Sequence, residues 1–203
     1  MATTISSGRG SSPLLTANIA DHGTIYGGRG LEFDGVTDYL NFNTRVSNLD
    51  GNDWSLSAWV KPTTNKISVI WGQSTGGYGI KLMLYDDGRV LLQWRDSGNS
   101  ARELTSVANT ATIGNWCHVA VTWESQTKAV LYVNGENVSE HTTVADVRLN
   151  ASSNIDAQTR DNFLVSYQGG SYPHLTLSDL KRFDCALTEA QVQELYLKPE
   201  QSA

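Results

Sequence analysis

The sequence predicts an all-β protein, an antiparallel β-sandwich of the jelly-roll type with one short C-terminal helix. Short β-rich runs recur along the 203-residue chain, and clusters of Gly, Asp and Asn separate them. Only the C-terminal region carries a clear helical pattern. Many short strands with turn signals between them are typical of sandwiches and jelly rolls. The predicted strands are residues 31–33, 39–42, 54–61, 67–71, 78–85, 89–94, 116–123, 129–133, 137–142, 162–167 and 175–183.

The clearest local signal lies in residues 116–135. Alternate side chains of the first strand point to opposite faces of a sheet. The next β-rich run ends in Asn134-Gly135, and Asn-Gly between apolar runs predicts a hairpin because a type I′ turn needs positive φ at both central residues. A two-residue turn pairs Val133 with Glu136, Tyr132 with Asn137 and Leu131 with Val138.

The register of a second hairpin, residues 78–95, follows from its apolar pattern. A three-residue loop at 86–88 places Gly88 at the left-handed position and puts six apolar residues on one face, whereas a two-residue turn does not. The pairs are then Leu84 with Val90, Leu82 with Leu92 and Ile80 with Trp94. The opposite face carries Lys81, Met83, Tyr85, Arg89, Leu91 and Gln93.

The predicted helix lies near the C-terminus, where Thr188 and Gln191 have the spacing of a capping box. We expect this helix to pack on the sandwich. Residues 1–28 are rich in Gly, Ser and Thr, and are predicted to form an arm with little regular structure and one short strand near 13–18. Such an arm packs on its own domain or reaches a neighbour. The predicted domain is 29–197, and 198–203 form a tail.

Composition excludes some classes of partner. The net charge is −6 and the basic residues are scattered singly, which argues against nucleic acid and against insertion into or binding to an anionic membrane. No window has the apolar length of a membrane span, and the first 15 residues do not read as a signal peptide. We therefore expect a virion-surface location if the chain is phage-encoded, and otherwise a cytoplasmic or unassigned one. Cys117 and Cys185 either bridge or, as their apolar contexts favour, remain buried free thiols.

Four segments in order resemble the LamG-like jelly roll of the concanavalin A-like lectin/glucanase superfamily. They are GLEFDGVTDYL at 30–40, WSLSAWVKP at 54–62, WCHVAVTWES…LYVNG at 116–135 and LSDLKRFDCALTEAQVQELY at 177–196. Together they cover about residues 29–197. The resemblance implies the fold strongly and the function weakly, because this fold hosts lectins, hydrolases, adhesins and structural modules.

The resemblance also implies a candidate calcium ion. The family's closing strand often carries a calcium-binding Asp, and that place falls on Ser178 here, with Asp179 one residue later. A shift of one residue in a strand turns the side chain to the other face. With Asp179 turned away from the family's place, we expect Asp34 or Asp38 and backbone carbonyls to contribute to the site, and the candidate calcium ligands are Asp34, Asp38 and Asp179. No other cofactor is expected, since the His and Cys spacing does not match a zinc site.

Catalysis is not expected. The glucanase branch uses paired glutamates on one strand. The nearest match here is Glu32, but the two positions where the second glutamate could stand hold Thr37 and Asp38. The string Gly-Gln-Ser-Thr-Gly at 72–76 matches a nucleophile elbow, but a strand rather than a helix follows it.

Recognition is the remaining function, and it calls for exposed aromatic faces and planar polar groups. The candidate ligand-binding residues are Tyr78, Tyr85, Arg89, Gln93, Tyr172 and His174. The sequence favours a non-catalytic binding or structural module. The first hypothesis is a phage virion surface protein, in a capsid or tail, that forms a homo-oligomer or lattice and contacts host glycans. The alternative is a free-standing lectin-like carbohydrate-binding protein, and a glycoside hydrolase ranks below both.

Overall fold

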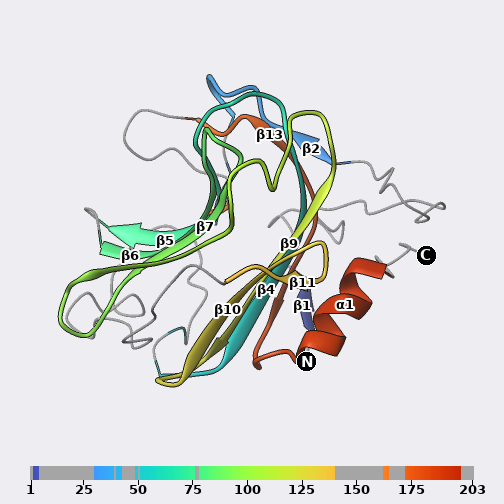
Figure 1. Ribbon diagram of the computed structural model, residues 1–203. Helices are drawn as coiled ribbons and strands as arrows, with labels where there is room; N and C mark the ends of the chain where they lie inside the picture. Colours follow the sequence, from blue (N-terminus) through green and yellow to red (C-terminus); the bar gives the residue numbers. More distant parts are fainter. Residues whose placement is uncertain are drawn as a thin grey trace.

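Two antiparallel sheets pack face to face in the computed structural model (Figure 1). The structure describes residues 2–4, 30–38, 40–42, 49, 51–75, 78–139, 162–164 and 172–197. Within that part, the seven-stranded sheet has the order β1 (Ala2–Thr4), β13 (Leu175–Phe183), β4 (Trp54–Pro62), β9 (Cys117–Glu124), β10 (Lys128–Val133) and β11 (Glu136–Asn137), with β2 (Leu31–Glu32) also paired to β13. The predicted fold class is confirmed.

The six-stranded sheet forms the other layer. Its order is β3 (Leu40–Phe42), β12 (Asn162–Leu164), β5 (Ser68–Thr75), β6 (Tyr78–Leu84), β7 (Val90–Arg95) and β8 (Ala101–Thr105). Strands β5 to β8 follow one another in the chain as a meander, which lies on the left of Figure 1. Their outer face is therefore built largely from one continuous stretch of sequence.

Four tryptophans form the centre of the core between the sheets. Trp54, Trp71, Trp94 and Trp123 are fully buried. The rings of Trp54 and Trp123 stack with centroids 5.5 Å apart, and Trp94 meets Trp123 edge-on at 5.3 Å. Stacked and edge-to-face aromatic pairs stabilise a core beyond the area that they bury. This cluster draws on both sheets and holds them together.

Both predicted hairpin registers are confirmed. Strand β6 pairs with β7 through Ile80–Trp94, Leu82–Leu92 and Leu84–Val90, and Gly88 has φ of +77°. Strand β10 pairs with β11 through Val133–Glu136 and Tyr132–Asn137. Asn134 and Gly135 have φ of +51° and +80°, as a type I′ turn requires.

Helix α1 (Glu189–Leu197) covers part of the outer face of the seven-stranded sheet (Figure 1). The predicted capping box is present, since Thr188 N donates to Gln191 Oε1 at 2.9 Å and Gln191 N donates to Thr188 Oγ1 at 3.3 Å. The buried Val192 packs with Ala120, Val130 and Tyr132. These contacts give the seven-stranded sheet a second hydrophobic layer outside the main core.

Two expectations need correction, and several lie outside the described residues. Strand β8 was not predicted, because only Leu104 of its five residues is buried and no alternation shows in the sequence. The cysteines are free thiols, but Cys185 is exposed and only Cys117 is buried. The expected strand near 13–18 and half of the one at 137–142, residues 140–142, lie outside the described residues.

Candidate ligand-binding surface

The outer face of strands β6, β7 and β8, hereafter the β6–β8 face, combines an apolar centre with polar margins. The strand registers align Met83, Leu91 and Thr105 in one row across the three strands. Val69, Met83 and Leu91 are buried together there, and Tyr85 packs against them. The next row holds Lys81, Gln93 and Glu103. An apolar floor beside a row of polar groups is a general feature of ligand-binding surfaces.

Tyr85 and Arg89 flank the hairpin loop at one end of this face. The guanidinium of Arg89 lies over the Tyr85 ring, with its Cζ 5.2 Å from the centroid. Arg89 Nε also donates to Asp87 Oδ2 at 2.7 Å, and both side chains are about 40% exposed. The guanidinium thus covers part of the tyrosine ring, and the ion pair with Asp87 holds it there.

Gln93 and Glu103 occupy the middle of the polar row. Gln93 Nε2 donates to Glu103 Oε1 at 2.6 Å, and Glu103 is exposed. Arg95 lies two residues beyond Gln93 on β7, on the same side of the strand. Burial, and then the charge of Arg95, lower the pKa of Lys81 below its ordinary value. Donors, an acceptor and two cations therefore share one part of the face.

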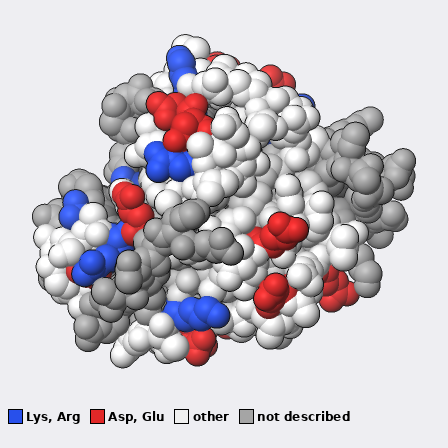
Figure 2. Space-filling model, viewed as in Figure 1, with Lys and Arg blue, Asp and Glu red and all other residues white. Residues whose placement is uncertain are grey.

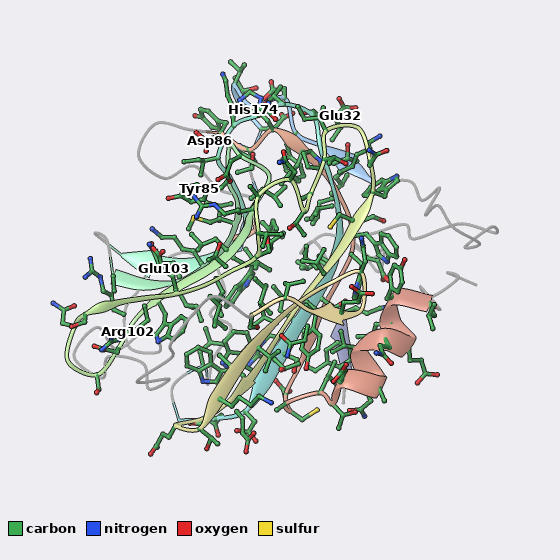
Figure 3. All side chains as sticks on the ribbon, viewed as in Figure 1. Glu32, Tyr85, Asp86, Arg102, Glu103 and His174 are labelled. Atoms are coloured by element: carbon green, nitrogen blue, oxygen red, sulfur yellow. The ribbon has the colours of Figure 1, made fainter. Side chains whose placement is uncertain are left out.

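Tyr172 and His174 lie in a segment that reaches the same end of the sandwich as the Tyr85 loop. His174 N donates to Ser68 Oγ at 2.9 Å, and Ser68 pairs with Leu84, the neighbour of Tyr85. Figure 3 shows Tyr85, Asp86 and His174 toward this end, with Glu103 farther along the sheet. Tyr172 and His174 are half-buried. The side chain of the sixth candidate, Tyr78, lies outside the described part.

Close packing, rather than open space, surrounds His174. Its ring lies against Gly35, where a Cβ would come within 1.9 Å of the ring, so only glycine fits. Burial lowers the pKa of His174, with a smaller lowering from Lys66 and an opposing effect from Asp34. The His174 ring therefore packs against the 34–38 turn.

The three candidate calcium ligands do not come together as one set. Asp34 holds the 34–38 turn: its Oδ1 accepts from Val36 N, Thr37 N and Asp38 N at 2.8–3.0 Å, and its Oδ2 accepts from Thr37 Oγ1. Those bonds, chiefly from Thr37 and Val36, hold the pKa of Asp34 well below its usual range. Asp179 lies at a bulge in β13, and its Oδ2 accepts from Lys181 Nζ at 2.9 Å.

Asp179 also differs from the solvated strand residue that its sequence context suggests. It is buried and has a left-handed φ of +49°, because the register of β13 slips between Ser178 and Lys181. Among the described residues, no group of three His, Cys, Asp or Glu side chains is placed to hold a metal ion. Calcium binding stays a prediction for this chain.

A buried histidine lies under α1 and resembles part of a catalytic dyad. His118 Nε2 and Ser57 Oγ are 2.8 Å apart, but both residues are almost completely buried. Burial, and then the charge of Lys181, lower the pKa of His118 to about 3. The rings of Trp59 and Tyr196 lie 5.4 Å and 6.0 Å from it. His118 therefore meets a buried partner, and its neutral ring is part of the scaffold.

The two segments that partly match catalytic motifs lie in strands. Glu32 pairs with Thr176 on β13, and Ser74 pairs with Gly79 inside the β5–β6 hairpin. A nucleophile elbow needs a sharp strand-to-helix turn, which continuous pairing excludes at Ser74. The Cys117 thiol is unreactive as well, because burial raises its pKa to about 12. None of these groups adds chemistry to the β6–β8 face.

Sequence reasoning missed three residues of this face as site candidates: Lys81, Arg95 and Glu103. The hairpin register already placed Lys81 beside Gln93, and extending β7 by one residue would have included Arg95. Glu103 needed strand β8, for which the sequence gives little signal.

Charge on the side of the molecule shown in Figure 2 is mixed rather than grouped by sign. Acidic and basic side chains are scattered there among neutral ones. Among the described residues, no helix is long and apolar enough to cross a membrane.

Several solved structures share this fold. The receptor-binding domain of botulinum neurotoxin D matches with a TM-score of 0.57 and 16% identity over 96% of this chain and 47% of that one. The binding domain of botulinum neurotoxin DC in complex with SialylT gives 0.58 and 13%, over 82% and 41%. The native heptameric SAP-like pentraxin from Limulus polyphemus gives 0.54 and 17%, over 81% and 80%. The chain spans less than half the length of the two toxin domains.

Comparison with curated protein sequences finds no match. A laminin G family model, described as the concanavalin A-like lectin/glucanases superfamily, matches residues 34–193. That range includes both sheets from the 34–38 turn onward and most of α1. The chain therefore belongs to the concanavalin A-like lectin/glucanases superfamily.

Proposed function

We propose that this chain is a non-catalytic module that binds a carbohydrate on its β6–β8 face. The observation that carries the proposal is that Tyr85 and Arg89 lie on the same face as the Gln93–Glu103 pair, with the apolar row of Met83 and Leu91 between them. Membership of a superfamily that includes lectins supports it.

Sugars have two kinds of surface, and this face offers a partner for each. The C–H faces of a sugar ring pack on flat, weakly polar surfaces such as a tyrosine ring. Hydroxyl groups need donors and acceptors, and Gln93 and Glu103 supply both farther along the same face. Because Gln93 and Glu103 already bond to each other, they are oriented before a ligand arrives, which lowers the entropic cost of binding.

Recognition accounts for these residues better than hydrolysis does. A glycosidase needs two carboxyl groups facing each other across the scissile bond. On the β6–β8 face, the hydrogen-bond partner of Glu103 is the Gln93 amide. Asp87, at the loop, is engaged with Arg89 instead.

A glycan array tests this proposal. The full chain is applied with and without calcium, since Asp34, Asp38 and Asp179 remain candidate ligands. We expect specific binding that Tyr85→Ala and Gln93→Ala weaken at least about tenfold, consistent with the loss of one good contact each. Gln193→Ala is the matched control, because Gln193 is exposed on α1, outside the β6–β8 face. An array without specific binding in either condition contradicts the proposal.

A second candidate function is display on a virion, where the same module decorates a capsid or tail. Strand β1 favours assembly, because this three-residue strand lies at one end of the seven-stranded order and its pairing within the described residues is with β13. The same backbone pattern suits pairing with the edge of a neighbouring copy. Sedimentation with purified capsids or tails tests this role. A strictly monomeric chain without affinity for either structure contradicts it.

A further inference from the structure

Two cations lie next to each other on the β6–β8 face. Lys81 pairs with Gln93 across β6 and β7, and Arg95 is two residues beyond Gln93 on the same side of β7. Diagonal neighbours of this kind in an antiparallel pair are about 7–8 Å apart at Cα, within reach of long side chains. The positive charges of Lys81 and Arg95 therefore act on one small area.

Placing these charges together has an electrostatic cost. Lys81 is half-buried, and both its burial and the charge of Arg95 disfavour its protonated form. The chain has a surplus of acidic residues, with a net charge of −6. Yet among the described residues Lys81 forms no ion pair, and the carboxylate in its row, Glu103, accepts from Gln93. A bound anion would remove this cost.

The residues that flank the two cations are small. Gly72 lies opposite Lys81 on β5, and Ala101 lies opposite Arg95 on β8. A Cβ on Gly72 would come within 3.3 Å of Lys81 Cγ, so the stem of Lys81 lies along the glycine backbone. Short side chains therefore lie directly opposite both cations on the neighbouring strands, and the guanidinium of Arg95 donates through Nη1 to the backbone oxygen of Asn99 at 3.2 Å.

We propose that the ligand of the β6–β8 face is an acidic glycan, and that its carboxylate or sulfate group binds between Lys81 and Arg95. This inference rests on the proposed function and names the chemical class of the sugar. A planar guanidinium binds a carboxylate or a sulfate in a fork, and the ammonium of Lys81 adds a point charge. The Tyr85 and Gln93 contacts then hold the neutral part of the sugar.

The experiment compares the same sugar cores with and without an acidic group. Lactose, 3′-sialyllactose and 3′-sulfated lactose, together with the matching neutral, sialylated and sulfated glycans of an array, are measured at low ionic strength. We expect the acidic forms to bind about tenfold or more tightly than the neutral core. The preference should shrink at high salt, because screening weakens partly exposed charge pairs. The two acidic arms distinguish a carboxylate from a sulfate ligand.

Two variants and one control locate the anion. Lys81→Gln and Arg95→Gln should each remove most of the acidic preference, so that the ratio of acidic to neutral binding falls toward one. Lys128→Gln, an exposed lysine on β10 of the other sheet, should leave that ratio unchanged. Thermal melting checks folding, and Lys81→Gln should melt at the same temperature or higher because it removes the repulsion from Arg95.

The outcomes separate the two proposals. Binding of neutral glycans without preference for acidic ones, or an acidic preference that survives both variants, overturns the acidic-ligand inference and leaves the carbohydrate-binding proposal in place. The absence of binding to any glycan overturns both. Competition by inorganic sulfate alone, with no sugar dependence, also contradicts the inference, because it identifies a simple anion site.

Discussion

The outer faces of the two sheets follow the same strand alternation and have opposite characters. On the seven-stranded sheet, α1 packs over Ala120, Val130 and Tyr132, and the polar Ser57 and His118 beneath it bond to each other. On the six-stranded sheet, Gln93 and Glu103 form their pair with Glu103 exposed, and Arg89 is partly exposed beside Tyr85.

The difference teaches that polarity alone does not mark a functional face. Ser57 and His118 have the side chains of a catalytic dyad, but burial excludes substrate and keeps the histidine neutral. The β6–β8 face has ordinary side chains whose exposure and orientation suit recognition. Substitutions on the helix-covered face should therefore change stability, and substitutions on the β6–β8 face should change binding.

The largest expected effect is on the helix-covered face. Val192→Asp places an unpaired carboxylate at a fully buried position of α1, and should lower the free energy of unfolding by about 3 kcal/mol or more. Leu197→Asp, at a position 64% exposed on the same helix, is the control and should stay within about 0.5 kcal/mol. Urea unfolding measures both. Equal effects would show that α1 does not seal this face.

The second-largest effect on stability is expected from acidic pH, through the protonation of His118. Its pKa is about 3 in the folded protein against an ordinary 6.5, so below pH 6.5 the unfolded state binds a proton that the folded state does not. Stability should be complete above pH 6.5 and fall progressively toward pH 3. Melting temperatures from pH 7 to 4 should show this slope, and His118→Gln should flatten it more than His174→Gln. An unchanged slope in His118→Gln would contradict the assignment.

A smaller effect is expected at the turn that touches α1. Gly135→Ala puts a side chain at φ of +80°, 3.1 Å from Cδ1 of Tyr196, and should cost about 1–2 kcal/mol or more. Gly51→Ala has a similar φ of +74° with nothing within 4 Å, so it measures the backbone cost alone. The difference between the two unfolding energies reports the contact with the helix. No difference would mean that the turn and α1 are energetically independent.

The smallest effect on stability is expected on the β6–β8 face. Arg89→Ala removes an ion pair whose partners are 38% and 41% exposed. Exposed pairs of this kind contribute about 1 kcal/mol or less. Unfolding should therefore change little while glycan binding weakens. A loss of more than about 2 kcal/mol would place this face among the structural ones.

The sequence predicts local pairing well because turn chemistry and alternation act over a few residues. Asn134-Gly135 and Gly88 set their turns, and both hairpin registers follow. Strand β8 was missed because an edge strand buries few side chains, and Leu104 is the one buried apolar residue that marks its inner face. The left-handed Asp179 was missed because a bulge depends on pairing with β4, which local sequence does not reveal.

The candidate site was predicted in part for the same reason. Tyr85, Arg89 and Gln93 share one hairpin, so its register alone brought them to one face. Their partner Glu103 comes from β8, and the importance of Lys81 depends on Arg95 and Gly72 on neighbouring strands. Contacts between strands that no local pattern pairs need the three-dimensional structure.

The most direct test of the assignment of the two faces is an NMR titration of the full chain with the best glycan from the array. The account predicts that amide signals shift on β6, β7 and β8, most strongly around Lys81, Gln93 and Glu103, while those of α1 and β9 stay in place. Shifts centred on α1, or around Trp116, whose ring lies 5.4 Å from Lys61 Nζ of β4, would contradict the assignment of the β6–β8 face as the ligand-binding surface.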